Sequence, residues 1–127
     1  MKSTESIIEQ KSFRFAVRII NLYNFLQENA KEYVLSKQVL RSGTSIGANV
    51  SEALSSESTT DFIHKLGIAA KEVRETSYWL RLLSETKFID EKSFSSIHEE
   101  CKELLKIINS IILTTKQKQE NKRKKSE

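Results

Sequence analysis

The sequence predicts an all-α protein, folded as an antiparallel, up-down-up-down four-helix bundle with left-handed packing. Its 127 residues include no proline and three glycines. Long helices can therefore run without interruption, whereas strand-rich folds need turn residues every few positions. Apolar residues recur at spacings of three and four in four separate segments, as they do on the buried face of a helix. Short polar stretches separate these segments and suit connections between neighbouring helices.

The first helix is expected from about Glu5 to Asn29. Its core stripe is Ile8, Phe15, Ile19, Leu22 and Leu26. Phe13, Val17 and Ile20 lie on a second flank, which widens the apolar arc to about 220°, against roughly 100° for a surface helix. A helix that is apolar over so much of its circumference must be covered from two sides. In a chain this small, we expect the second cover to be another subunit.

The second helix is expected from about Leu35 to Ser55. Its core stripe is Val39, Gly43, Ile46, Val50 and Leu54. Gly43 and Gly47 flank this stripe and would let another helix come close, which would compensate for a loss of roughly 1 kcal/mol of helix propensity at each. The opposite side carries an ordered set of polar side chains, here called the polar row: Arg41, Ser45, Asn49 and Glu52.

The third helix is expected from about Thr60 to Lys87, and the fourth begins near Glu91 or Ser93. The core stripe of the third is Phe62, Leu66, Ala69, Val73, Leu80 and Leu83. The fourth carries a heptad-like seam typical of a left-handed bundle: Phe94, Ile97, Cys101, Leu104, Ile108 and Ile111. Ile68, Trp79 and Leu82 point away from the core of the third helix. Because an exposed tryptophan is costly, we expect a partner to cover Trp79.

The positive charge is concentrated at the C-terminal end. The stretch 114–127 holds six of the 21 basic residues and two of the 17 acidic ones, so fifteen of each sign remain in the rest of the chain. This stretch is poor in apolar residues and rich in Lys, Gln and Glu. We therefore expect a bundle over residues 1–115 and a basic, disordered tail over residues 116–127.

The sequence offers no catalytic residues, metal ligands or cofactor site, and a non-enzymatic protein is expected. His64 and His98 lie on different helices without a carboxylate or cysteine at a metal-ligand spacing, so a structural or exposed role is expected for each. The single cysteine, Cys101, fits a small buried apolar role and a reducing cytoplasm. No apolar run is long enough for a membrane span, and no signal peptide is visible.

The second helix resembles a family signature. The pattern Arg-x-x-x-Ser-Ile-x-x-Asn-Val-x-Glu-Ala, from Arg41 to Ala53, is similar to that of small bacterial four-helix-bundle proteins encoded in intervening sequences of large-subunit ribosomal RNA genes. Lys11-Ser12-Phe13, residues 58–62 and residues 68–75 extend the resemblance to most of the chain. Ala53 and Ala70-Lys71 depart from the family pattern, which often has Gly and Gly-Ser there. The resemblance implies a homopentamer related to accessory proteins of diversity-generating retroelements, which engage nucleic acid and a reverse transcriptase.

Two functional hypotheses follow. In the first, the protein is a homo-oligomer that binds RNA or DNA through basic surfaces, as an accessory factor to a reverse transcriptase or ribosomal RNA. The candidate nucleic-acid-binding residues are Lys11, Arg14, Arg18, Arg74, Arg81, Lys122, Arg123, Lys124 and Lys125. The candidate oligomer interface is Phe13, Val17, Ile20, Ile68, Trp79 and Leu82. The alternative is a protein-interaction module with no direct nucleic-acid role. The polar row serves either as a buried network that sets helix register or as a ligand surface.

Overall fold

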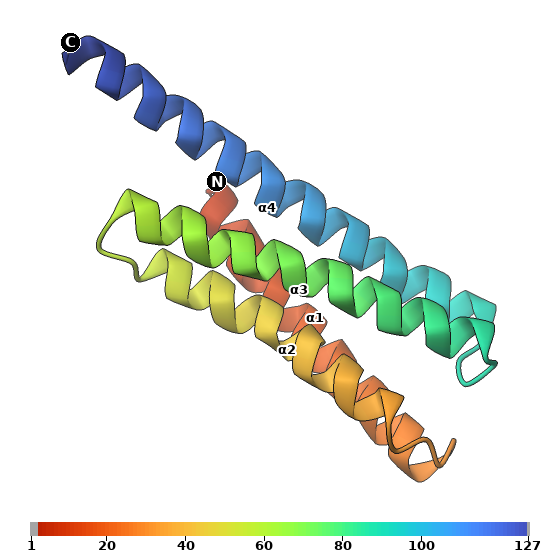
Figure 1. The fold of residues 1–127 in the computed structure, drawn as a ribbon. Coiled ribbons are helices and arrows are strands. Elements are labelled where there is room, and N and C mark those ends of the chain that lie inside the picture. Colours follow the sequence, from red (N-terminus) through yellow and green to blue (C-terminus); the bar gives the residue numbers. More distant parts are fainter. Residues whose placement is uncertain (1–2, 127) are drawn as a thin grey trace.

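The structure, a computed structural model, describes residues 3–126. Over this range the chain forms four helices and no strand: α1 (Thr4–Glu28), α2 (Leu35–Leu54), α3 (Thr59–Glu85) and α4 (Glu91–Ser126). They pack side by side as a bundle, in which α2 and α4 each contact both α1 and α3 (Figure 1). The α2–α3 connection lies at the same end as the N-terminus, and the other two connections lie at the opposite end. The all-α prediction is confirmed, and the predicted helix starts are within one or two residues.

Polar side chains cap the N-terminal ends of three of the four described helices. The Ser3 hydroxyl accepts a hydrogen bond from the Ser6 backbone N–H at 3.1 Å, and Ser58 accepts one from Asp61 at 3.0 Å. Before α4, the Asp90 carboxylate accepts from the Ser93 backbone N–H at 2.7 Å. Hydrogen bonds from Ser93 lower the pKa of Asp90. These bonds satisfy backbone donors that have no partner within the helix, and so help to define where α1, α3 and α4 start, whereas Val34 before α2 makes no such side-chain bond.

The core follows the predicted stripes. The largest fully buried side chains are Phe15, Ile8, Ile19, Leu26, Ile46, Leu66, Leu80, Leu83, Leu104, Ile108, Val39 and Val50. Ala53 is also buried, while the neighbouring Leu54 packs only partly against the core. A buried polar pair joins α2 to α3, because the Thr76 hydroxyl lies 2.9 Å from the Ser42 hydroxyl and 2.7 Å from the Glu72 carbonyl oxygen. Its hydrogen bonds offset the cost of burying these groups.

The glycines of α2 allow α1 to approach closely, as the sequence predicted. A Cβ added at Gly43 would lie 2.7 Å from Cγ1 of Ile19, and one added at Gly47 would lie 3.2 Å from the Ser12 carbonyl oxygen. Gly67 on α3 differs, since an added Cβ there would meet no atom within 4 Å. The two α2 glycines therefore set the α1–α2 distance, while Gly67 does not serve close packing.

The C-terminal end of α4 differs from the expected disordered tail. The helix continues to Ser126 and projects beyond the other three helices (Figure 1); Glu127 lies outside the described residues. The reason is local, because this stretch contains no glycine or proline and is built from Lys, Gln, Glu and Arg, which favour helix. Glu120 and Arg123 also form an ion pair at 2.8 Å across one turn. None of the described helices has the length and apolar content needed to cross a membrane.

Candidate functional site

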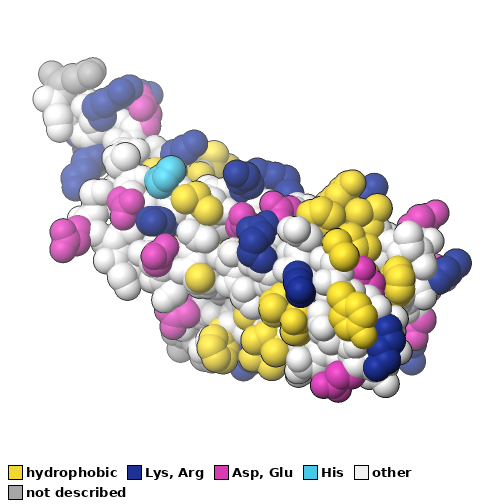
Figure 2. All heavy atoms as spheres, turned by 60° about the horizontal axis from the view of Figure 1, so that its bottom comes forward, with side chains coloured by type: hydrophobic (Ala, Val, Ile, Leu, Met, Phe, Trp, Pro, Cys, Tyr) yellow, Lys and Arg dark blue, Asp and Glu magenta, His cyan; other side chains and the backbone are white. Residues whose placement is uncertain are grey.

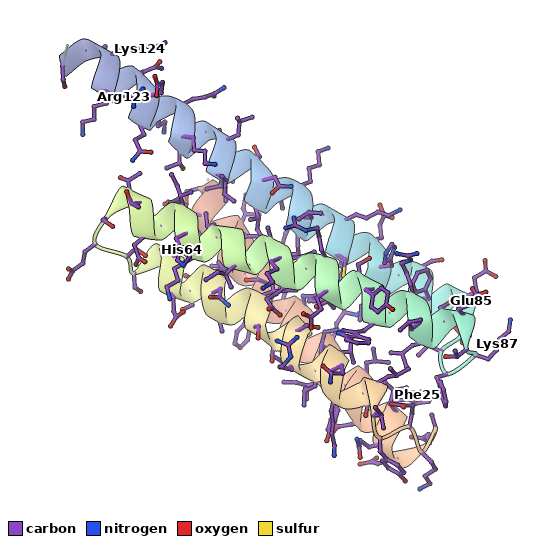
Figure 3. All side chains as sticks on the ribbon, viewed as in Figure 1. Phe25, His64, Glu85, Lys87, Arg123 and Lys124 are labelled. Carbon is purple, nitrogen blue, oxygen red and sulfur yellow. The ribbon has the colours of Figure 1, made fainter. Side chains whose placement is uncertain are left out.

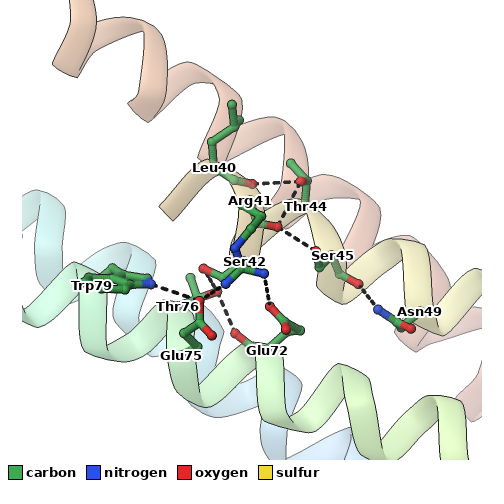
Figure 4. A network of polar contacts seen from close by, with 10 residues as sticks. All are labelled: Leu40, Arg41, Ser42, Thr44, Ser45, Asn49, Glu72, Glu75, Thr76 and Trp79. Atoms are coloured by element: carbon green, nitrogen blue, oxygen red, sulfur yellow. Dashed lines mark hydrogen bonds and ion pairs between the residues drawn. The ribbon is translucent and has the colours of Figure 1, made fainter. Parts of the chain in front are cut away.

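The polar row of α2 faces α3. The Arg41 guanidinium forms ion pairs with the carboxylates of Glu75 and Glu72, the latter at 3.3 Å (Figure 4). Glu72 is mostly buried, with 11% of its side chain exposed, whereas half of the Arg41 side chain is exposed. The indole N–H of Trp79 donates to Glu75 at 3.1 Å. Arg41 thus holds two carboxylates of the neighbouring helix together.

The other members of the polar row also have partners. The Ser45 hydroxyl donates to the Arg41 carbonyl oxygen at 2.7 Å, and the Asn49 amide donates to the Ser45 carbonyl oxygen at 2.9 Å. Glu52 lies 3.4 Å from the Lys65 ammonium of α3. The row therefore reaches α3 at its two ends and bonds to its own helix between them. Sequence analysis had not identified Glu72 and Glu75 as partners, although their spacing of three places both near one line along α3.

The predicted basic stripe of α1 is matched by acidic residues of α4. Lys11 forms an ion pair with Glu103, and Arg18 forms one with Glu100. Arg14 lines a pocket of about 120 Å³ together with Lys11, Glu100, Glu103 and Leu104. Exposed ion pairs of this kind contribute little stability. However, the two carboxylates cancel much of the positive potential that a phosphate group would need here.

A second surface, between α3 and α4, is a groove with cations but no carboxylate among its lining residues. This α3–α4 groove has a volume of about 260 Å³ and is lined by Val73, Arg74, Ser77, Arg81, His98, Cys101, Lys102 and Leu105. Val73 and Cys101 are buried, whereas Arg74, Arg81 and Lys102 are exposed. Within residues 3–126 neither arginine takes part in an ion pair. The positive charge of the groove is therefore not neutralised by its own lining.

His98 lies partly buried within this groove. Its Nε2 is 2.7 Å from the Ser77 hydroxyl, and its ring stacks on Phe94 with centroids 4.8 Å apart. Burial lowers the pKa of His98, and the nearby charges of Lys102 and Arg81 lower it further, against an opposing effect of Glu99. Burial also raises the pKa of the Cys101 thiol to about 12, so this group stays neutral at physiological pH. The imidazole therefore experiences the positive charge of the groove.

The sequence placed Arg74 and Arg81 among the candidate phosphate contacts but missed their partners across the groove. His98 and Lys102 stand four residues apart on α4, a spacing that puts both side chains on one face. Arg74 and Arg81 stand seven residues apart on α3, a spacing that also places both side chains on one face of the helix. These spacings were visible in the sequence. That the two faces meet is set by the packing of α3 against α4.

The predicted interface residues divide into two groups. On α1, Phe13 is 69% exposed, Val17 45% and Ile20 44%. Ile68, Trp79 and Leu82 of α3 are only partly exposed. Trp79 packs against the core and meets Tyr78 edge-on with centroids 5.2 Å apart. The expectation that Trp79 points away from the core is therefore corrected: α3 is packed between α2 and α4, so its buried surface is wider than one stripe.

Charge and apolar surface are unevenly distributed over the molecule. One face of the molecule carries patches of hydrophobic side chains among Lys, Arg, Asp and Glu, towards the end away from the projecting helix (Figure 2). At the projecting end of α4, Arg123 and Lys124 extend from the helix, while His64 lies near the α2–α3 connection (Figure 3). Lys122, Arg123, Lys124 and Lys125 are all exposed. The predicted tail residues thus stand clear of the bundle.

Two comparisons relate this chain to known proteins. The profile of a family described as 23S rRNA-intervening sequence protein matches residues 4–110. A crystal structure of a protein with unknown function from the S23 ribosomal protein family of Bacteroides thetaiotaomicron VPI-5482 is 51% identical in sequence. That alignment covers 87% of this chain and 98% of the other, with a TM-score of 0.86. No curated protein matches. The matched region includes the polar row and the α3–α4 groove, and it ends before the basic end of α4.

Proposed function

Because this chain belongs to the 23S rRNA-intervening sequence protein family, we propose that it is a non-enzymatic protein that binds RNA or DNA through basic surfaces as a homo-oligomer. The resemblance to accessory proteins of diversity-generating retroelements extends this proposal to a homopentamer in the cytoplasm, with a reverse transcriptase or ribosomal RNA as a partner. We further propose that the four helices form an antiparallel, up-down-up-down bundle with left-handed packing. Connections at alternate ends and the contact of α1 with α4 support that order.

The observation that carries the nucleic-acid proposal is the uneven pairing of cations. The α1 stripe is matched by Glu100 and Glu103. In contrast, the α3–α4 groove and the projecting end of α4 present Arg and Lys that outnumber nearby carboxylates. A Lys or Arg that is not already paired with a carboxylate can neutralise a phosphate group. Each phosphate neutralised in this way releases counterions from the nucleic acid, which favours binding. Contacts to phosphate also carry no sequence preference, so binding should be broad rather than sequence specific.

The proposed assembly rests on the exposed apolar side chains of α1. Phe13, Val17 and Ile20 form a stripe on the outside of the bundle, and burying it in a second copy would remove apolar area from water. Assembly would also serve binding. Weak phosphate contacts on each subunit combine through effective concentration, so a ring would bind a long strand much more tightly than one subunit.

The first prediction concerns mass in solution. Light scattering is expected to give a particle several times the chain mass of 14.6 kDa, with about five copies for the pentamer. Phe13→Asp is expected to reduce this mass, because a carboxylate in an apolar interface is left unpaired and desolvated. Val34→Asp is the matched control, since Val34 and Phe13 are both 69% exposed. A monomeric parent protein at micromolar concentration would contradict the assembly. If Phe13→Asp leaves the particle mass unchanged, the apolar stripe of α1 is not the oligomer interface. It would then be a binding surface for a different protein, as the interaction-module hypothesis holds.

The second prediction concerns salt. The logarithm of the association constant for single-stranded RNA is expected to fall linearly with the logarithm of salt concentration, with a slope of about 0.7 per phosphate contact. Truncation after Thr115 removes six basic residues and is expected to lower both affinity and slope. Fluorescence anisotropy at several salt concentrations measures both, for RNA and DNA of equal length. No binding at low salt would exclude the proposal, and complete loss on truncation would confine nucleic-acid contacts to the end of α4.

A further inference from the structure

We propose that the α3–α4 groove is a binding site for a single phosphate group, held by Arg74, Arg81 and Lys102 and sensed by His98. We assign this phosphate to the backbone of a nucleic acid, and that assignment rests on the proposed function. The site itself rests on the groove, and it can be tested without a polymer.

The first argument is shape. The groove is an existing hollow of about 260 Å³ between two packed helices, with the buried Val73 and Cys101 beneath the exposed cations. Pockets for drug-sized ligands measure roughly 300–1,000 Å³. The α3–α4 groove is slightly smaller, which suits a phosphate group with part of the adjoining sugar. Its apolar base would face the sugar carbon atoms while the rim would face the charged oxygens.

The second argument is charge. Arg74 and Arg81 stand two turns apart on one helix, and Lys102 stands opposite them on the other. A guanidinium presents several N–H donors in a planar fork that matches the oxygens of a phosphate. Of the three cations, only Lys102 forms an ion pair, with Glu99 at 3.8 Å at the exposed surface. The α1–α4 pocket, with two carboxylates in its lining, is the contrasting case in the same molecule.

The third argument is the position of His98. The charged groups that act on its imidazole are Lys102 and Glu99 of α4 and Arg81 of α3, and Ser77 is its hydrogen-bond partner. Burial is the main cause that disfavours the protonated imidazole, and the two positive groups among these three disfavour it further. A bound phosphate would reverse the sign of the nearby charge and raise the pKa of His98. By reciprocity, protonation of His98 would strengthen phosphate binding by the same factor.

The experiment follows His98 by NMR while pH is varied, in the full chain. The main probe is a uridine dinucleotide, whose one phosphodiester keeps a fixed charge across the titration. We expect saturating dinucleotide to raise the pKa of His98 by about 0.5–1 unit, so that affinity increases about 3–10-fold as the imidazole becomes protonated. Inorganic phosphate at constant pH is the second probe, and its binding is measured by the change in the His98 chemical shift. A shift with phosphate but not with dinucleotide would assign the groove to a free phosphate compound and overturn the nucleic-acid source.

The controls are pairs of substitutions of equal charge. Arg74→Ala with Arg81→Ala is expected to abolish the ligand-induced shift, and both residues are exposed, so folding should be preserved. Lys37→Ala with Lys92→Ala removes two exposed cations elsewhere and is expected to leave the shift unchanged. The site is overturned if the dinucleotide leaves the His98 pKa unchanged and phosphate leaves the His98 chemical shift unchanged, or if the ligand-induced shift survives in the Arg74/Arg81 variant. If polymer RNA binds without changing the His98 pKa, the groove is not the phosphate site, although the proposed function stands. If the dinucleotide changes the His98 pKa but polymer RNA does not bind, the proposed function is overturned, although the phosphate site stands.

Discussion

Replacing Gly43 with alanine is expected to lower the free energy of unfolding by about 1–3 kcal/mol, the usual cost of overpacking a core. The added Cβ would lie 2.7 Å from Cγ1 and 2.8 Å from Cγ2 of Ile19. Ile19 is fully buried, and a β-branched side chain has few alternative rotamers in a helix. Either Ile19 leaves its rotamer or α1 moves away from α2. This cost must exceed the roughly 1 kcal/mol that alanine adds in helix propensity.

Gly67→Ala is the matched control, because Gly67 is also within a helix but an added Cβ would meet no atom within 4 Å. This variant is expected to be more stable than the parent by about 0.5–1 kcal/mol. Urea unfolding followed by circular dichroism measures both, at one protein concentration because assembly also contributes to stability. Equal stabilisation by the two substitutions would show that the α1–α2 distance is not set by Gly43.

Replacing Arg41 with alanine is expected to destabilise the fold by about 1–3 kcal/mol. The substitution leaves the mostly buried carboxylate of Glu72 without its cation and next to Glu75. Loss of one partner from a fully buried ion pair costs more, but half of the Arg41 side chain is exposed and water screens part of the effect. Arg123→Ala removes an ion pair on the projecting part of α4, where the Arg123 side chain is 71% exposed, and is expected to change stability by less than about 0.5 kcal/mol.

The Arg41 variant also separates the two interpretations of the polar row. If the row fixes the register of α2 against α3, Arg41→Ala combined with Glu72→Gln should recover part of the lost stability, because the unpaired charge is removed. If the row serves a ligand, Arg41→Ala should leave stability unchanged and weaken RNA binding instead. Denaturant unfolding and RNA titration of the same three proteins distinguish these outcomes.

The sequence alone determined the four helices and the composition of the core. Spacings of three and four residues identified Phe15, Ile19, Val39 and Leu66, among others, as buried, because the period of an α-helix is a property of the chain itself. The polar stretches between the apolar segments located the helix starts to within one or two residues, whereas the C-terminal end of α4 lies well beyond the expected one. The close approach at Gly43 was also predictable, since a small residue beside a core stripe costs helix propensity unless it permits packing.

Only the tertiary structure decided which charges remain available. Lys11 and Arg18 belong to a basic stripe in the sequence, yet Glu103 and Glu100, more than eighty residues away, neutralise them in the fold. Arg74, Arg81 and Lys102 have no such carboxylates lining the groove that they share. The physical reason is that helical periodicity assigns a residue to a face of its own helix but does not specify what faces it. The electrostatic potential at a surface between two helices depends on the charged residues of both, so it is known only once the packing of the two helices is known.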